Sequence, residues 1–220
     1  MDINEEKLAG IAFIGNVLAP FYLEDPRTGS AADTFKAVAQ LDVSAAAQDW
    51  PFVDEGAAAE QLGMMAAGLA DSLTPAGEFE AAEEITWEYR RLFVGPQALP
   101  VPPFGSVYTD YECVIFGHTT AALREWNRKH GVARHADMDE PDDQVGFMLY
   151  EMSWLAQNQP QDVAEFLQLH FLPWAGHLLG ELADATENPF YKGLALLTHA
   201  SLDGIQTALE LEVVEPEFYR

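Results

Sequence analysis

The stretch from Pro141 to Leu155, PDDQVGFMLYEMSWL, shows the pattern that decides the fold class of this chain. Its apolar residues recur at steps of three or four, which is typical of one face of an α-helix. These residues are Val145, Met148, Leu149, Met152 and Leu155. Proline is favoured at the first helical position, and the helix dipole favours Asp142 and Asp143 in the first turn. We therefore expect an amphipathic helix that begins at Pro141.

Segments on both sides of this stretch have the same periodicity. Residues 119–130 predict a helix closed by Gly131. Another helix is expected from Pro160 onward, with a break or kink at Pro173. Further helices are expected over residues 8–18, 30–41, 56–73, 75–93 and 189–211.

The helix expected over residues 75–93 has Thr74 as its cap and Pro75 as its first residue. Its apolar stripe consists of Phe79, Ala82, Ile85, Tyr89, Leu92 and Phe93. An acidic turn is expected at residues 137–141. Because no convincing strand pair or tandem repeat is present, we expect an all-α fold. The expected architecture is a single globular domain of about ten helices over residues 1–220.

The chain is strongly acidic, since 36 Asp and Glu against 11 Lys and Arg give a formal net charge of −25. Nucleic acid is excluded as a main partner because phosphate binding needs a positive face. Docking on an anionic membrane surface is disfavoured for the same reason. A partner with a basic segment is favoured. Disorder is a poor interpretation because 49% of the residues are hydrophobic.

The amino-terminal residues are acidic and lack the positive start of a signal peptide. No apolar stretch reaches the length of a membrane span. Cys113 is the single cysteine, which rules out an intramolecular disulfide and a multi-cysteine metal cage. The simplest expectation is a cytoplasmic protein that is not embedded in a membrane.

The sequence contains none of the common enzyme motifs: no phosphate-binding loop, no HExxH and no GxSxG. His170 and His177 are seven residues apart, but Pro173 lies between them, so packing or capping is a better interpretation than metal binding. Acidic and apolar neighbours favour an inert, packed thiol at Cys113. We expect no catalytic residue, no metal and no cofactor.

Residues 95–106 hold four of the 13 prolines and cannot form a helix. The segment is either a linker or hinge, or a rigid structured loop. It lies next to the aromatic end of the helix expected over 75–93. The aromatic and apolar residues there are either core or the wall of a groove rimmed by acids. Such a groove would suit a peptide that is apolar with a basic end.

Four stretches carry a family pattern in a fixed order. They are YRRLFVGP at 89–96 with PPFGSVY at 102–108, EPDDQVG at 140–146, HFLPW at 170–174 and NPFY at 188–191. Together they resemble the TorD/DmsD family of redox-enzyme maturation chaperones, and they are most similar to its dimethyl-sulfoxide-reductase chaperones. The resemblance covers roughly residues 87–195. Residues 1–86 match only in helical character.

The resemblance implies a TorD-like, all-α chaperone in the cytoplasm rather than an enzyme. Such a chaperone binds the twin-arginine signal peptide of a molybdenum-cofactor oxidoreductase of the DMSO-reductase type. It holds the apoenzyme until the cofactor is loaded, before export. The implied partners are this peptide and the apoenzyme. The resemblance also allows the translocation machinery as a further partner. The implied oligomeric state is a monomer or a dimer that exchanges helices.

The resemblance also implies a peptide-binding site. Its residues are Tyr89, Leu92, Phe93, Pro103, Phe104, Gly105, Ser106, Tyr108, Asp143 and Gln144. Two of them depart from the family pattern. Phe104 stands where Trp is common, which loses an indole donor. Gln144 stands where His is usual, which loses a group that titrates near neutral pH.

Two other function classes remain open at this point. One is a nucleotide- or small-molecule-binding enzyme on a helical scaffold, against which the missing phosphate loop argues. The other is a helical adaptor with a different client. Calorimetric titration with nucleotides and with a candidate signal peptide separates the enzyme from the chaperone.

Overall fold

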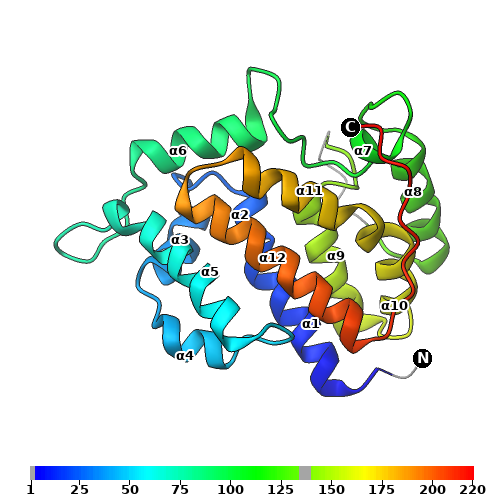
Figure 1. The fold of residues 1–220 in the computed structure, drawn as a ribbon, viewed down its shortest axis with the longest axis horizontal. Coiled ribbons are helices and arrows are strands. Elements are labelled where there is room, and N and C mark those ends of the chain that lie inside the picture. The colour runs from blue at the N-terminus through cyan, green and yellow to red at the C-terminus, as the bar shows by residue number, and fades with distance from the viewer. Residues whose placement is uncertain (1–2, 134–139) are drawn as a thin grey trace.

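The computed structural model describes residues 3–133 and 140–220, which fold as a helical assembly (Figure 1). The α-helices are α1 (Glu5–Leu18), α2 (Pro20–Leu23), α3 (Gly29–Ala39), α4 (Val43–Gln48), α5 (Glu55–Gly68), α6 (Glu83–Tyr89), α7 (Ser106–Thr109), α8 (His118–His130), α9 (Val145–Asn158), α10 (Val163–Phe166), α11 (Leu172–Ala185) and α12 (Pro189–Ala208). One 3₁₀ segment, η1 (Ala70–Ser72), and two π segments, η2 (Arg90–Val94) and η3 (Leu167–Phe171), complete them. The described residues form no β-strand, only two isolated bridges. The prediction of an all-α fold with about ten helices is confirmed.

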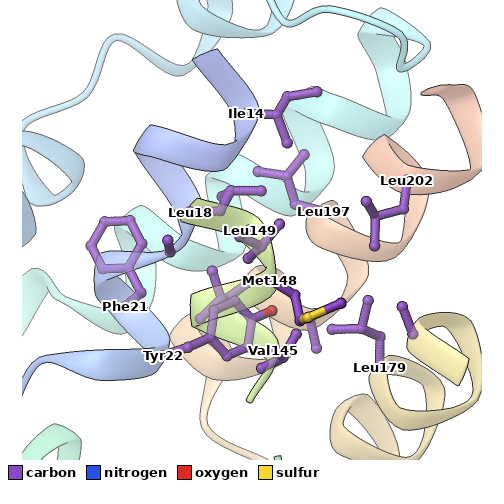
Figure 2. Packing of buried hydrophobic residues seen from close by; sticks show 14 of the residues in the cluster. Ile14, Leu18, Phe21, Tyr22, Val145, Met148, Leu149, Leu179, Leu197 and Leu202 are labelled. Carbon is purple, nitrogen blue, oxygen red and sulfur yellow. The ribbon is translucent and has the colours of Figure 1, made fainter. Parts of the chain in front are cut away.

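Helix α9 lies in the core, between α1 and the carboxyl-terminal helices. Figure 2 shows Val145, Met148 and Leu149 of α9 among side chains from α1, α11 and α12. All five predicted apolar-face residues of α9 are fully buried. Helix α12 crosses the molecule between α5 and α11 and packs against both (Figure 1). The amphipathic pattern that predicts α9 therefore also places it correctly against the core.

Small residues let these helices approach closely. A Cβ atom on Gly15 of α1 would overlap the carbonyl oxygen of Leu149 and lie 2.8 Å from the Cβ of Ser153, both on α9. Where α12 crosses α5, a Cβ atom on Gly193 would lie 2.6 Å from the carbonyl oxygen of Gln61. The absence of a side chain at these two positions sets the spacing of the helix pairs.

The prediction of a helix over residues 75–93 is wrong for the first part of that range. Instead, the N–H of Thr74 donates to the carbonyl of Glu78 at 2.9 Å, and Gly77 has a φ of +77°. A left-handed residue ends a helix, and glycine takes this conformation without steric cost. Helix α6 begins only at Glu83, and Phe79 stacks on Phe35 from the turn, with ring centroids 6.0 Å apart.

The start of α9 also differs from its prediction. The helix begins at Val145 rather than at Pro141, because the Gln144 side chain caps it and accepts from the N–H groups of Gly146 and Phe147. Asp142 and Asp143 consequently precede the helix instead of lying in its first turn. Most of the acidic turn predicted at 137–141 lies outside the described residues.

Three other predicted boundaries are confirmed, whereas the helix expected over residues 56–73 ends earlier, at Gly68. Gly131 closes α8 in the left-handed conformation, with a φ of +67°. Asn188 caps α12, where Pro189 is the first residue. Pro173 lies at the start of α11, directly after the π segment η3. The helix expected from Pro160 begins later, at Val163.

Within residues 3–133 and 140–220, none of the helices combines the length and the apolar character that a membrane crossing requires.

The close approach of α1 and α9 predicts opposite effects for two glycine substitutions. Gly15→Ala should lower the free energy of unfolding by about 1–3 kcal/mol, because the methyl group forces α1 away from α9. In Gly63→Ala, on α5, the added methyl group has no neighbour within 4 Å. This substitution should raise the free energy of unfolding by about 0.4–1 kcal/mol. Urea denaturation followed by circular dichroism measures both. Equal shifts in the same direction would contradict this packing.

Candidate peptide-binding site

A buried carboxylate joins the Pro-rich segment to the start of α9. Asp143 is 1% exposed. Its Oδ2 accepts the backbone N–H of Ser106 at 2.6 Å, and its Oδ1 accepts the hydroxyl of Thr120 at 2.9 Å. Ser106 begins α7, and Thr120 lies in the first turns of α8. One side chain therefore fixes three segments that are separate in the sequence.

Main-chain hydrogen bonds continue this junction. Gly105 donates to the carbonyl of Asp143 at 3.1 Å, and Val145 donates to the carbonyl of Pro103 at 2.9 Å. Between them, Phe104 and Gln144 form an isolated antiparallel bridge. The end of the Pro-rich segment is thus paired like a short strand with the residues that lead into α9.

The HFLPW stretch packs behind this pairing. A Cβ atom on Gly105 would lie 2.5 Å from Cε2 of Trp174, so only glycine fits. The Trp174 indole donates to the carbonyl of His170 at 2.7 Å, which fixes the ring. Burial lowers the pKa of His170 to about 4, so its imidazole is neutral at neutral pH. The described residues gather no group of three metal-ligating side chains.

Gln144 links the junction to the amino-terminal helices. Its oxygen caps α9, and its Nε2 donates to the carbonyl of Tyr22 at 3.3 Å. Capping and an amide hydrogen bond need no titratable group. Gln144, which stands where the family has histidine, therefore makes both hydrogen-bonding contacts without any change of protonation state.

A second cluster surrounds Phe93. Its ring centroid lies 5.8 Å from that of Tyr22, 5.6 Å from Tyr89 and 5.8 Å from Tyr191. Leu92 beside it is fully buried. Tyr22 belongs to both clusters, because its carbonyl accepts from Gln144. The structure therefore brings the two parts of the predicted site together through α2.

Carboxylates gather around the second cluster. Burial raises the pKa of Tyr89, and the negative charges of Asp25, Glu140 and Glu24 raise it further. The Oε2 atom of Glu24 is buried and has no hydrogen-bond partner among the described residues. Glu24 and Asp25 thus lie together where α2 ends, and Arg27 pairs with Asp25 there.

Most of the predicted site residues are packed inside the protein rather than displayed. Eight of the ten are buried, and only Phe93 and Phe104 are half-buried. Tyr108 on α7 is fully buried, and its hydroxyl donates to the carbonyl of Pro102 at 2.9 Å. The buried eight cannot form open surface themselves, but they shape the surface around them.

An open hollow that sequence reasoning missed lies beside this junction. Its volume is about 510 Å³, and its apolar walls include Leu23, Phe147, Tyr150 and Trp154. Glu24, Asp142 and Glu151 contribute carboxylates to it. Trp154 is 41% exposed and Tyr150 is 37% exposed. Phe147, Tyr150 and Trp154 recur at steps of three and four, so a second apolar face of α9 was the signal for this hollow.

Two of the hollow's carboxylates have fixed partners. Asp142 pairs with Arg124 of α8, and Glu151 accepts from the Asn127 amide at 3.1 Å. The third carboxylate belongs to Glu24, at the end of α2. The hollow therefore combines exposed aromatic surface with negative charge, and the described residues that line it include no cationic side chain.

The junction predicts a large loss of stability for Asp143→Ala. The substitution leaves the Ser106 N–H and the Thr120 hydroxyl without their acceptor in a buried place. The free energy of unfolding should fall by about 1–3 kcal/mol. Asp71→Ala removes an exposed acid and should change it by less than about 0.5 kcal/mol. Urea denaturation of both variants tests the assignment, and similar losses would refute it.

The chain is similar in sequence to known proteins. A family model described as the nitrate reductase delta subunit matches residues 55–179. The protein named "Probable Tat proofreading chaperone DmsD" from Haemophilus influenzae is 45% identical over 138 residues, which cover 63% of this chain and 68% of that protein. The Tat proofreading chaperone DmsD from Salmonella typhimurium is 35% identical over 155 residues, which cover 69% of this chain and 76% of that protein.

A solved structure shares the fold. It is that of a candidate redox-enzyme maturation protein from Archaeoglobus fulgidus, which superposes with a TM-score of 0.51 at 16% sequence identity. The superposition covers 92% of this chain and 97% of the other.

Proposed function

Because the chain belongs to the TorD/DmsD family of redox-enzyme maturation chaperones, we propose that it binds the twin-arginine signal peptide of its client. The protein is a chaperone rather than an enzyme. The proposed client is the apo form of a molybdenum-cofactor oxidoreductase of the DMSO-reductase type, held in the cytoplasm until its cofactor is loaded. The relatives named Tat proofreading chaperones support this proposal.

The observation that carries the proposal is the hollow beside the start of α9. A twin-arginine signal peptide has two positive charges followed by an apolar stretch. The hollow offers the matching surfaces: exposed Tyr150 and Trp154 for the apolar part, and Glu24 with Glu151 for the charges. Recognition of an apolar segment in a groove is a common mode of peptide binding.

The apolar part of the peptide supplies most of the affinity in this proposal. Burying roughly 400 Å² of apolar surface is worth about 10 kcal/mol before costs. Loss of translational and rotational freedom removes about 4–15 kcal/mol. Exposed ion pairs add only about 0.2–1 kcal/mol each. The carboxylates therefore orient the peptide and speed its approach more than they hold it.

The ten predicted motif residues keep a role in this proposal. We assign direct contact with the peptide to the half-buried Phe93 and Phe104. The buried members act as positioning residues, because Asp143 and Gln144 fix the start of α9, from which Phe147 and Trp154 face the hollow. A neutral Gln144 performs this positioning without any dependence on pH.

Loss of one aromatic wall tests the hollow. Trp154→Ala should weaken binding of a twin-arginine signal peptide by about tenfold or more, as expected for an aromatic anchor. Trp87→Ala removes a tryptophan that is 61% exposed on α6 and should leave the affinity unchanged. Isothermal titration calorimetry measures both, with circular dichroism to confirm folding.

A second peptide separates charge recognition from apolar binding. In this control peptide, both arginines are replaced by glutamine. Glu24→Gln should weaken binding of the twin-arginine peptide and leave the glutamine peptide unaffected. Equal losses from Trp154→Ala and Trp87→Ala would refute the choice of hollow. The absence of binding for either peptide to the unaltered protein would refute the function itself.

The acidic surface predicts a salt effect on the association rate. The formal net charge of −25 should attract a basic peptide. Salt screens this attraction, and the screening length is about 8 Å at physiological ionic strength. The association rate constant measured by stopped flow should fall steadily as salt rises, while the dissociation rate changes less. An association rate that is indifferent to salt would limit the acidic surface to a role in solubility.

A further inference from the structure

The residues after α12 form an extended strap on the outside of the helices. Figure 1 shows this red segment leaving α12 and ending beside α7. None of residues 212–220 is fully buried, and Val214 is 83% exposed. The strap therefore contributes little to the core, and its opening would expose little apolar surface.

The strap is nevertheless held at one place by specific contacts. The N–H of Tyr219 donates to the carbonyl of Tyr108 at 2.9 Å. The imidazole of His177 stacks on Phe218, with centroids 4.1 Å apart and an angle of 10° between the rings. The same imidazole donates from Nε2 to the carbonyl of Arg220 at 2.9 Å. Main-chain pairing with alternate side-chain contacts is how proteins bind extended peptides.

The guanidinium group of Arg220 is also recognised. Its Nη2 donates to the carbonyls of Leu99 and Pro100, at 3.4 and 3.2 Å. A segment rich in proline has few N–H donors, so its carbonyls remain available to an external donor. Glu181 adds negative charge, with its carboxylate 3.8 Å from Nε2 of His177. The Pro-rich segment therefore offers two carbonyl acceptors to an arginine at this corner.

An open hollow lies between the strap and the helices. It has a volume of about 350 Å³. Its lining includes Leu169, Pro173 and Trp174 from the helices, and Val214 and Pro216 from the strap. A volume of this size lies within the range of small-ligand pockets.

We propose that this surface, the strap groove, binds an extended, arginine-bearing segment of the client. The strap groove consists of Tyr108, His177 and the carbonyls of Leu99 and Pro100. Residues 216–220 occupy it as an internal pseudo-ligand, and the client's segment displaces them. The inference rests on the proposed function, because it names a second contact for the same signal peptide. It explains why an exposed segment is held by an aromatic stack and an arginine site.

Occupation by the strap lowers the apparent affinity for the client. A peptide that needs an open groove binds only to the fraction of molecules whose strap is released. If the strap is closed in about nine molecules of ten, its release raises the affinity roughly tenfold. The strap would then favour clients that contact both the strap groove and the hollow beside α9 over weaker, non-specific peptides.

Weakening the strap tests the proposal. In the double variant Phe218→Ala/Arg220→Gln, both anchors are removed from exposed or half-buried positions, so the fold should remain. The matched control is Phe13→Ala/Arg128→Gln, which makes the same chemical changes on α1 and α8, where the contacts are with Trp50 and Glu125. Circular dichroism confirms the fold of both variants, and isothermal titration measures binding of the twin-arginine signal peptide. The strap variant should bind it roughly tenfold more tightly than the unaltered protein, and the control should bind it equally well.

A synthetic peptide of residues 212–220 gives an independent measurement. This peptide should bind to the strap variant. Its affinity for the matched control, whose own strap occupies the groove, should be roughly tenfold lower. Adding His177→Ala to the strap variant should reduce this binding. Unchanged signal-peptide affinity in the strap variant would overturn the displacement and leave the proposed function intact. No signal-peptide binding to any variant would instead overturn the function. Failure of the 212–220 peptide to bind the strap variant would overturn the groove itself.

Discussion

The carboxylate of Asp143 is the contact on which the candidate site depends. A buried charge is unfavourable unless donors replace the water that it loses. Here the Ser106 N–H and the Thr120 hydroxyl supply those donors. Because the two donors come from α7 and α8, while Asp143 leads into α9, satisfying one charge determines the positions of three segments. The hollow and the strap groove are both bordered by these segments.

This arrangement separates the residues that shape the surface from those that face solvent. Conformational precision comes from buried groups such as Gln144 and Trp174, which have fixed partners. Recognition of an apolar peptide needs exposed apolar area, which Tyr150 and Trp154 provide. Exposed aromatic surface promotes association between copies of a protein. The formal net charge of −25 opposes that association by mutual repulsion.

Local sequence signals were reliable where one interaction dominates. The apolar period of α9, the left-handed Gly131 and the Asn188 cap each depend on residues within a few positions of one another. The prediction failed at residues 75–82, although Phe79 fits the helical stripe. The turn around Gly77 supplies hydrogen bonds that compete with the helix, and Phe79 gains a partner in Phe35, far away in the sequence.

The sequence by itself determined the fold class, the acidity and the family, because helical periodicity, charge and ordered motifs can all be read from the order of residues. Only the tertiary structure decided which motif residues are buried and where the open surface lies. Burial depends on contacts between distant segments, such as the bond from Gln144 to Tyr22 across 122 positions. No local pattern encodes that pairing, so the hollow and the strap groove appear only when the chain is folded.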